Sequence, residues 1–239
     1  MKPGSVNRPC SGAAPVLRGD PPKTGAPLGA LWLFATLFGI VEAALVADLR
    51  FFLDPDSTRF PFVRLPGTLL LIELVREGVT LVLLATVARL AVRRPAARFA
   101  AFLDVFGIWD LVYYVGLRFM LGWPRGLTDW DLLFLLPVPW LGPVYAPLIL
   151  ALTMVGVGGA TLRHDARYGR FQVWPRHLLV AGLAGLACIS SFTIDPGAVE
   201  RGVLPSRYPI ELLALGLVIG MLAWADLWRR NRRLRHLTG

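Results

Sequence analysis

Charge, cysteine and histidine are all scarce in this chain of 239 residues. Charged residues make up 17% of the chain and hydrophobic residues 55%, whereas soluble domains carry about 25% charged residues. The two cysteines, Cys10 and Cys188, lie in a polar segment and inside an apolar run, which argues against a disulfide framework. The three histidines lie in or beside basic segments, which disfavours a haem held between helices, and no Cys/His spacing of a zinc site occurs. We therefore expect no cofactor and no metal.

Long hydrophobic runs dominate what is present, and several exceed the 18 residues or so that a membrane span needs. The sequence predicts an all-α polytopic membrane helix bundle with about six transmembrane helices in a single domain over 28–228. The expected spans are 29–48, 67–92, 99–121, 143–162, 177–194 and 209–228. Residues 1–27, which hold six prolines, are expected to form a disordered cytoplasmic tail, and 229–239 a basic cytoplasmic tail.

Basic residues are distributed unevenly between the two sides that these spans define. Sixteen Lys and Arg residues fall in the two tails and in loops 93–98 and 163–176, whereas the alternate loops hold six. Because cytoplasmic loops are enriched in Lys and Arg, both termini are predicted to be cytoplasmic. The net charge of +9 is thus explained by membrane orientation, and no nucleic-acid partner is expected; the lipid bilayer is the expected partner.

Six charged residues interrupt the apolar spans at similar predicted depth. They are Glu42, Glu73, Arg76, Glu77, Asp110 and Arg118. An unpaired ion at the bilayer centre costs about 2.5–3.5 kcal/mol on insertion scales, so six would cost about 15–20 kcal/mol. That exceeds the roughly 5–15 kcal/mol that stabilises a typical fold. These groups must therefore pair, be protonated or line a wet cavity.

Helical spacing indicates that these groups converge. Residues 73–80 of the second span place Glu73, Arg76, Glu77 and Thr80 in one stripe about 100° wide, and the third span has a similar polar stripe. We expect the two stripes to face each other in a pocket open to the outer side, with loop residues above it. The candidate substrate- or ion-binding residues are Glu42, Glu73, Arg76, Glu77, Asp110, Tyr114, Arg118, Asp129 and Asp131. No catalytic residue is assigned.

The segment between the third and fourth spans has an unusual composition. Thr128 or Asp129 could cap a short helix over the apolar run that follows, which Pro137 and Pro139 would end. We expect a short interfacial or re-entrant helix on the outer side, with tryptophans at headgroup level. The alternative is a longer, kinked fourth span that starts near Leu132.

Small residues recur in the late spans, and Gly216 and Gly220 have the small-xxx-small spacing that permits close helix contact. Such pairs usually pack within one bundle. A homodimer through them is the open alternative.

Three runs carry a resemblance to a known family. They are FGIWDLVYY from Phe106, LGWP from Leu121, and DWDLLFLLPVPWLGP from Asp129. Together with the block Glu73-Leu-Val-Arg76-Glu77, these runs resemble the sequences of an uncharacterised family of bacterial multi-spanning membrane proteins, over roughly residues 38–150. The resemblance implies a helical fold in a bacterial inner membrane and implies no activity.

Three classes of function remain open from the sequence. The first is a carrier or binding protein for a small solute, cation or proton, which the polar pocket at membrane depth favours. The second is a membrane-embedded enzyme acting on lipid, although no Ser/His or Cys/His nucleophile pattern is present. The third is a structural or assembly subunit whose charges fix helix register.

Overall fold

The computed structural model describes residues 28–53, 67–169 and 171–235. Its long helices are α1 (Leu28–Leu53), α2 (Gly67–Ala91), α3 (Pro95–Leu121), α4 (Tyr145–Tyr168), α5 (Pro175–Phe192) and α7 (Ile210–Arg235). A short helix α6 (Ala198–Arg201) and a hairpin of β1 (Trp130–Phe134) and β2 (Trp140–Pro143) complete the described elements. The all-α bundle is confirmed. The predicted tail at 1–27 lies outside the described residues.

Each predicted span appears as a helix. Five of these helices are long and apolar enough to cross a membrane: α1, α3, α4, α5 and α7. Helix α2 is not among them, because Glu73, Arg76, Glu77 and Arg89 interrupt its apolar residues. With 25 residues it is nevertheless about 37 Å long, which would be sufficient to span a hydrocarbon core.

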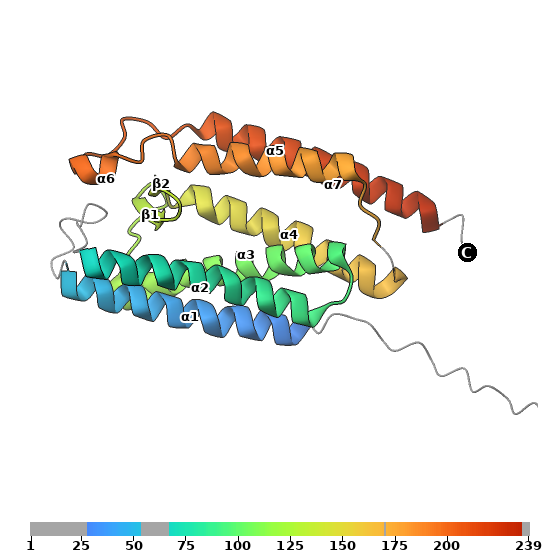
Figure 1. Cartoon of the computed structure of the whole chain (residues 1–239), viewed down its shortest axis with the longest axis horizontal. Helices are drawn as coiled ribbons and strands as arrows, with labels where there is room; N and C mark the ends of the chain where they lie inside the picture. Colours follow the sequence, from blue (N-terminus) through green and yellow to red (C-terminus); the bar gives the residue numbers. More distant parts are fainter. Residues whose placement is uncertain (1–27, 54–66, 170, 236–239) are drawn as a thin grey trace, which may run out of the picture.

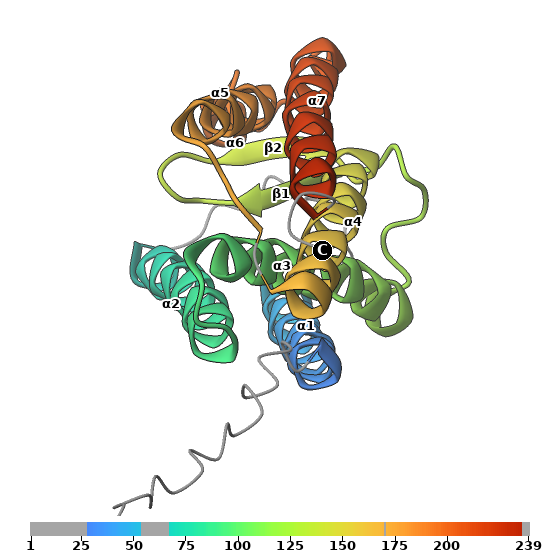
Figure 2. The same cartoon turned by 90° about the vertical axis from the view of Figure 1, so that its right-hand side faces the viewer.

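The helices form three layers, with α1 and α2 on one side, α3 and α4 in the middle, and α5 with α7 on the other side (Figure 1). Figure 2 shows the hairpin between the α5–α7 pair and the helices below it. One apolar core joins α1, α2, α3 and α4 around Leu84 and Leu162, and a second joins α5 and α7 to the hairpin around Phe192 and Leu213.

Proline and glycine mark several helix ends. Helices α3 and α5 begin at Pro95 and Pro175, whose fixed φ suits a first helical position, and each follows a residue in an extended conformation. Gly122 and Gly169 end α3 and α4 in the left-handed conformation that glycine adopts without strain. Helix α7 continues to Arg235, seven residues beyond the expected end of the sixth span at 228.

The predicted interfacial helix before α4 is wrong, because the segment forms the β1–β2 hairpin. The strands are antiparallel, and a bulge lies between Leu132 and Phe134. The carboxylate of Asp129 accepts hydrogen bonds from the backbone N–H groups of Arg125 and Gly126, which precede it, so it closes a turn instead of starting a helix. The alternative of a kinked span from Leu132 is also wrong, since α4 begins at Tyr145.

Close helix packing depends on two glycines in particular. A Cβ at Gly158 of α4 would lie 2.6 Å from the carbonyl oxygen of Ala100 in α3. A Cβ at Gly216 of α7 would lie 2.6 Å from the carbonyl oxygen of Ala184 in α5. The Gly216 spacing noted in the sequence therefore serves packing within this bundle.

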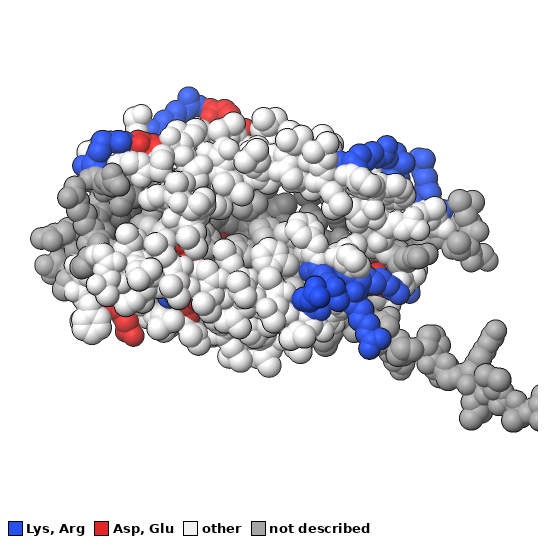
Figure 3. Space-filling view, in the orientation of Figure 1, with Lys and Arg blue, Asp and Glu red and all other residues white. Residues whose placement is uncertain are grey.

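Basic side chains gather at one end of the bundle, which we call the basic end. Figure 3 shows them where α2 passes into α3 and where α7 ends, while the opposite end carries both signs of charge. The described chain begins and finishes at this same end (Figure 1), as the alternation of basic loops predicts.

Candidate functional site

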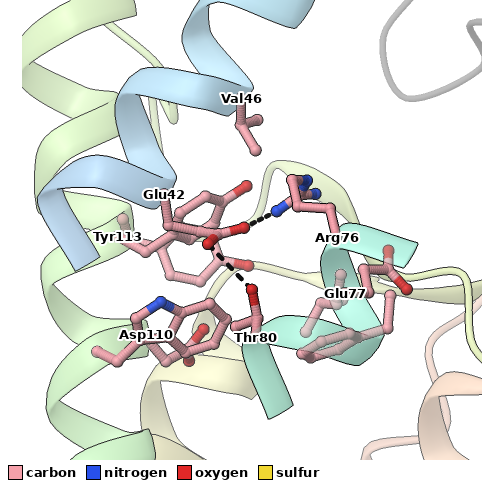
Figure 4. A pocket seen from close by; sticks show the side chains of 11 residues that line it. Glu42, Val46, Arg76, Glu77, Thr80, Asp110 and Tyr113 are labelled. Carbon is pink, nitrogen blue, oxygen red and sulfur yellow. Dashed lines mark hydrogen bonds and ion pairs between the residues drawn. The ribbon is translucent and has the colours of Figure 1, made fainter. Parts of the chain in front are cut away.

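A small cavity lies between α1, α2, α3 and the hairpin, and we call it the polar cavity (Figure 4). Its volume is about 30 Å³. It is lined by five of the nine predicted site residues: Glu42, Arg76, Glu77, Asp110 and Tyr114. Side chains from three helices that are distant in sequence therefore converge.

The polar cavity lies well inside the bundle. Glu77 is ten residues from the start of α2 at Gly67, or about 15 Å along the helix axis. Asp110 is eleven residues from the end of α3 at Leu121, or about 16 Å. Helix α2 begins and helix α3 ends at the same end of the bundle, so the two carboxylates lie at matching depth.

Glu42 is tied to α2 by two side chains. Its carboxylate forms an ion pair with Arg76 and accepts a hydrogen bond of 3.2 Å from the hydroxyl of Thr80. Arg76 also donates from Nε and Nη2 to Glu73, at 2.9 and 2.6 Å. Figure 4 shows Glu42 between Arg76 and Thr80. Arg76 thus joins two carboxylates and links α1 to α2.

Glu77 holds the tip of the hairpin. Its carboxylate accepts hydrogen bonds from the backbone N–H of Leu135, at 3.0 and 2.9 Å, and from that of Leu136, at 3.2 Å. Irregular backbone at membrane depth requires partners for its polar groups, because lipid supplies none. Glu77 supplies them here, so this buried charge has a clear structural role.

Asp131 is fully buried and has partners from two helices. Arg50 of α1 lies 3.1 Å from one carboxylate oxygen, and the hydroxyl of Tyr114 donates to the other at 2.8 Å. The Arg50 guanidinium lies 3.9 Å from the ring centroid of Trp123, a cation–π contact. Burial raises the pKa of Asp131, and the charge of Arg50 opposes that rise.

Arg50 was not among the predicted site residues, because the sequence suggested that the first helix ends near residue 48. Helix α1 instead continues to Leu53. The sequence signal for Arg50 was its spacing of four residues from Val46 and eight from Glu42, which places all three on one stripe of a helix. This signal applies only if the helix is extended beyond residue 48.

Asp110 differs from the other acids in the polar cavity. Its side chain is buried, with 8% of the residue exposed, and it forms no hydrogen bond or ion pair with the described residues. The indole N–H of Trp109, which also lines the cavity, is buried and without a hydrogen-bond partner in the described part of the chain. Buried polar groups normally have partners, so this pair marks the part of the cavity lining whose hydrogen-bonding capacity is unfilled.

Two predicted site residues neither line the cavity nor bond to the side chains that do. Arg118 is exposed, and its guanidinium donates to the carbonyl of Gly122 at the end of α3, a common interaction at helix C-termini. The carboxylate of Asp129 accepts the two backbone hydrogen bonds of the turn described above. The expectation that both join the cluster was wrong.

The buried cluster is acidic overall. It contains five carboxylates and two guanidinium groups: Glu42, Glu73, Glu77, Asp110, Asp131, Arg50 and Arg76. With every group ionised the formal charge is −3, counted as five negative and two positive groups. Such an excess at this depth calls for bound protons or a cation. Across 28–53, 67–169 and 171–235, no group of three or more His, Cys, Asp or Glu residues is arranged to hold a metal ion.

Comparison with known proteins gives no match: no family model, curated protein or solved structure is similar to this chain.

Proposed function

We propose that the chain is an integral membrane protein that carries or binds a proton or a small monovalent cation at Asp110. The observation that carries this proposal is a buried carboxylate that has no partner among the described residues and faces a cavity that two further acids line. A carboxylate in that setting gains from protonation or from a nearby cation, because burial penalises the free charge. The bundle lies in a bacterial inner membrane with the basic end in the cytoplasm.

The size of the cavity limits the occupant. A volume of about 30 Å³ accommodates one or two water-sized groups. Sites for organic ligands usually enclose about 300–1,000 Å³, which is at least ten times more. A proton, a water molecule that carries one, or a single small ion fits, whereas an organic solute does not fit without a rearrangement of the helices.

The partners of the other acids narrow the choice further. Glu42 is engaged by Arg76 and Thr80, and Glu77 by the hairpin backbone. A divalent ion would need several free carboxylate oxygens, and Arg76 competes for those closest to the cavity. A single proton exchange at Asp110 requires none of these bonds to break.

The same pairings favour a second candidate function. Glu42, Glu77 and Asp131 each connect elements that are distant in sequence, which is what a structural or assembly subunit would need. Under this alternative the charges serve folding alone, and Asp110 is permanently protonated.

Proton flux into proteoliposomes distinguishes the two functions. The protein is reconstituted with a pH-sensitive dye inside the vesicles, and a potassium diffusion potential drives protons inward. We expect flux with the unaltered protein and at least tenfold less with Asp110→Asn, because the amide cannot accept a proton at neutral pH. Asp48→Asn is the matched control, since Asp48 is exposed on α1 and outside the cavity.

A second readout covers the case of binding without flux. Infrared difference spectra across a pH titration should contain the carbonyl band of a protonated carboxylic acid, and Asp110→Asn should remove it while Asp48→Asn leaves it. Flux and spectra unaffected by Asp110→Asn, in a variant that melts like the unaltered protein, would rule out this proposal and leave the structural alternative.

A further inference from the structure

A second, larger cavity lies at the basic end of the bundle and shares no lining residue with the polar cavity. It has a volume of about 500 Å³ and lies between the start of α3 and the segment that leads from α4 into α5. Its lining contains Arg94 and Ala96 on one side and Phe171, Gln172 and Trp174 on the other. We call it the basic-end cavity. Its volume falls in the range of about 300–1,000 Å³ typical of ligand sites.

The basic-end cavity has more arginine than acid beside it. The side chain of Arg94 is 41% exposed, and its Nη1 lies 3.1 Å from both carboxylate oxygens of Asp165, which also accepts a hydrogen bond from the backbone N–H of Phe171 at 3.2 Å. Arg93 and Arg98 lie within one turn of it in sequence, and the lining itself contains no carboxylate. Figure 3 shows basic side chains concentrated at this junction of α2 and α3.

Two long helices begin at this cavity, and neither has a side-chain cap. Arg94 and Trp174 occupy the N-cap positions of α3 and α5, neither makes a capping hydrogen bond, and no acidic residue lies in either first turn. A helix N-terminus carries partial positive charge, and an anion normally complements it. Here two such ends add to the arginine charge at one cavity.

The aromatic side chains of the lining indicate which anion fits. Trp174 lies just before α5 and Phe171 is buried beside it. Tryptophan is enriched where the hydrocarbon core meets the headgroups. The helices that begin here, α3 and α5, are both long and apolar enough to cross a membrane. The opening therefore lies where lipid headgroups are, not in bulk solution.

We infer that the basic-end cavity binds the phosphate headgroup of an anionic phospholipid. The phosphate lies against the start of α3 and the start of α5, next to Arg94, the basic side chain of the lining, which Asp165 holds in place. This inference is independent of the proposal for Asp110, because the two cavities share no residue.

Lipid retention tests this inference. The protein is reconstituted in nanodiscs of phosphatidylcholine and phosphatidylglycerol, extracted into detergent, and the lipids that remain bound are counted by native mass spectrometry. We expect preferential retention of phosphatidylglycerol and a loss of about fivefold in Ala96→Glu, because one repelling charge near a headgroup costs about as much as one Lys or Arg contact gains. Gln172→Glu should act in the same direction from the opposite side.

The variants are chosen so that misfolding cannot imitate the result. A glutamate in the first turn of α3 complements the helix dipole, so Ala96→Glu should melt no lower than the unaltered protein. Ala96→Gln has the same shape without the charge and should retain the lipid. Arg233→Gln, at an exposed position of α7, changes the net charge by the same amount as Ala96→Glu.

Three outcomes would overturn the inference. Equal retention of both lipids by the unaltered protein is one. An equal loss in Arg233→Gln and Ala96→Glu is another, since it would mean attraction by the whole basic surface. Displacement of the lipid by inorganic phosphate at the same concentration would assign the cavity to a soluble anion.

Discussion

The two halves of the bundle differ in whether buried carboxylates help to join their elements. In the half that contains α1, α2, α3 and the hairpin, buried ion pairs and charge-assisted hydrogen bonds connect the elements, as at Arg50–Asp131 and Glu77–Leu135. In the α5–α7 pair, small residues let the helices approach closely, and Gly216 packs against Ala184. Ion pairs such as Arg207–Glu211 are exposed there.

The α5–α7 pair shows that this chain can pack helices without a buried carboxylate, since the side chains of Glu211 and Asp226 are 60% and 44% exposed. Association of membrane helices through small residues is sufficient for that. The five acids of the buried cluster in the other half are therefore not a general requirement of the fold. They need a local explanation. For Glu77 and Asp131 that explanation is the hairpin, whose polar groups need hydrogen-bond partners at membrane depth. For Asp110 the hairpin provides no such reason.

The largest effect is expected from Arg50→Met, because it leaves Asp131 buried without its cation. Removal of one partner of a buried ion pair costs about 3–5 kcal/mol. We expect a loss of that order in the free energy of unfolding in detergent at neutral pH. Arg207→Met is the matched control, and loss of its exposed pair with Glu211 should cost about 0–1 kcal/mol.

The effect of Arg50→Met should also depend on pH in a defined direction. Burial raises the pKa of Asp131, so the folded variant binds a proton more readily than the unfolded chain does. The loss in free energy of unfolding, relative to the unaltered protein, should therefore be largest at neutral pH. It should become smaller as the pH falls toward the ordinary aspartate pKa of about 4. A deficit independent of pH would show that packing on Trp123, not charge, is what was lost.

A smaller effect is expected from Glu77→Ala, which removes the acceptor for the N–H groups of Leu135 and Leu136. Two buried donors without partners cost about 2–4 kcal/mol, given roughly 1–3 kcal/mol for each and some relaxation. Hydrogen exchange at these amides should accelerate together with the loss of stability. Glu77→Gln keeps one acceptor oxygen and should lose less than half as much. Unchanged exchange in Glu77→Ala would contradict the anchoring of the hairpin by Glu77.

The sequence predicted the helices well because their signal is local. Apolar runs of sufficient length define spans, and the stripes of α2 and α3 follow from helical spacing alone, so Glu73, Arg76, Glu77, Asp110 and Tyr114 could be placed together. The boundaries were less accurate, since the third span was expected to begin at residue 99 and α3 begins at Pro95.

The sequence failed where a contact between distant segments decides the structure. The run from Asp129 has a helix cap and apolar residues, yet it forms a strand because Glu77, 58 residues away, binds the backbone at its tip. Arg118 lies on the same helix stripe as Asp110, but its guanidinium donates to the carbonyl of Gly122 and does not line the cavity. No local pattern distinguishes these outcomes, since the deciding partner is on another element or in the turn that follows.

The smallest effect, Gly216→Ala, tests the α5–α7 side of the comparison. The added Cβ would lie 2.5 Å from the sulfur of Cys188 and 2.6 Å from the carbonyl oxygen of Ala184, so the helices must separate. Overpacking of this kind costs about 1–3 kcal/mol of stability. The higher helix propensity of alanine offsets up to about 1 kcal/mol of that cost. Gly182→Ala is the control, because its Cβ would meet nothing within 4 Å, and it should be neutral or stabilising. Hydrogen exchange at Leu135 should stay unchanged in both variants, because Gly216 does not contact the hairpin anchor. Faster exchange there in Gly216→Ala alone would mean that the two halves are one cooperative unit.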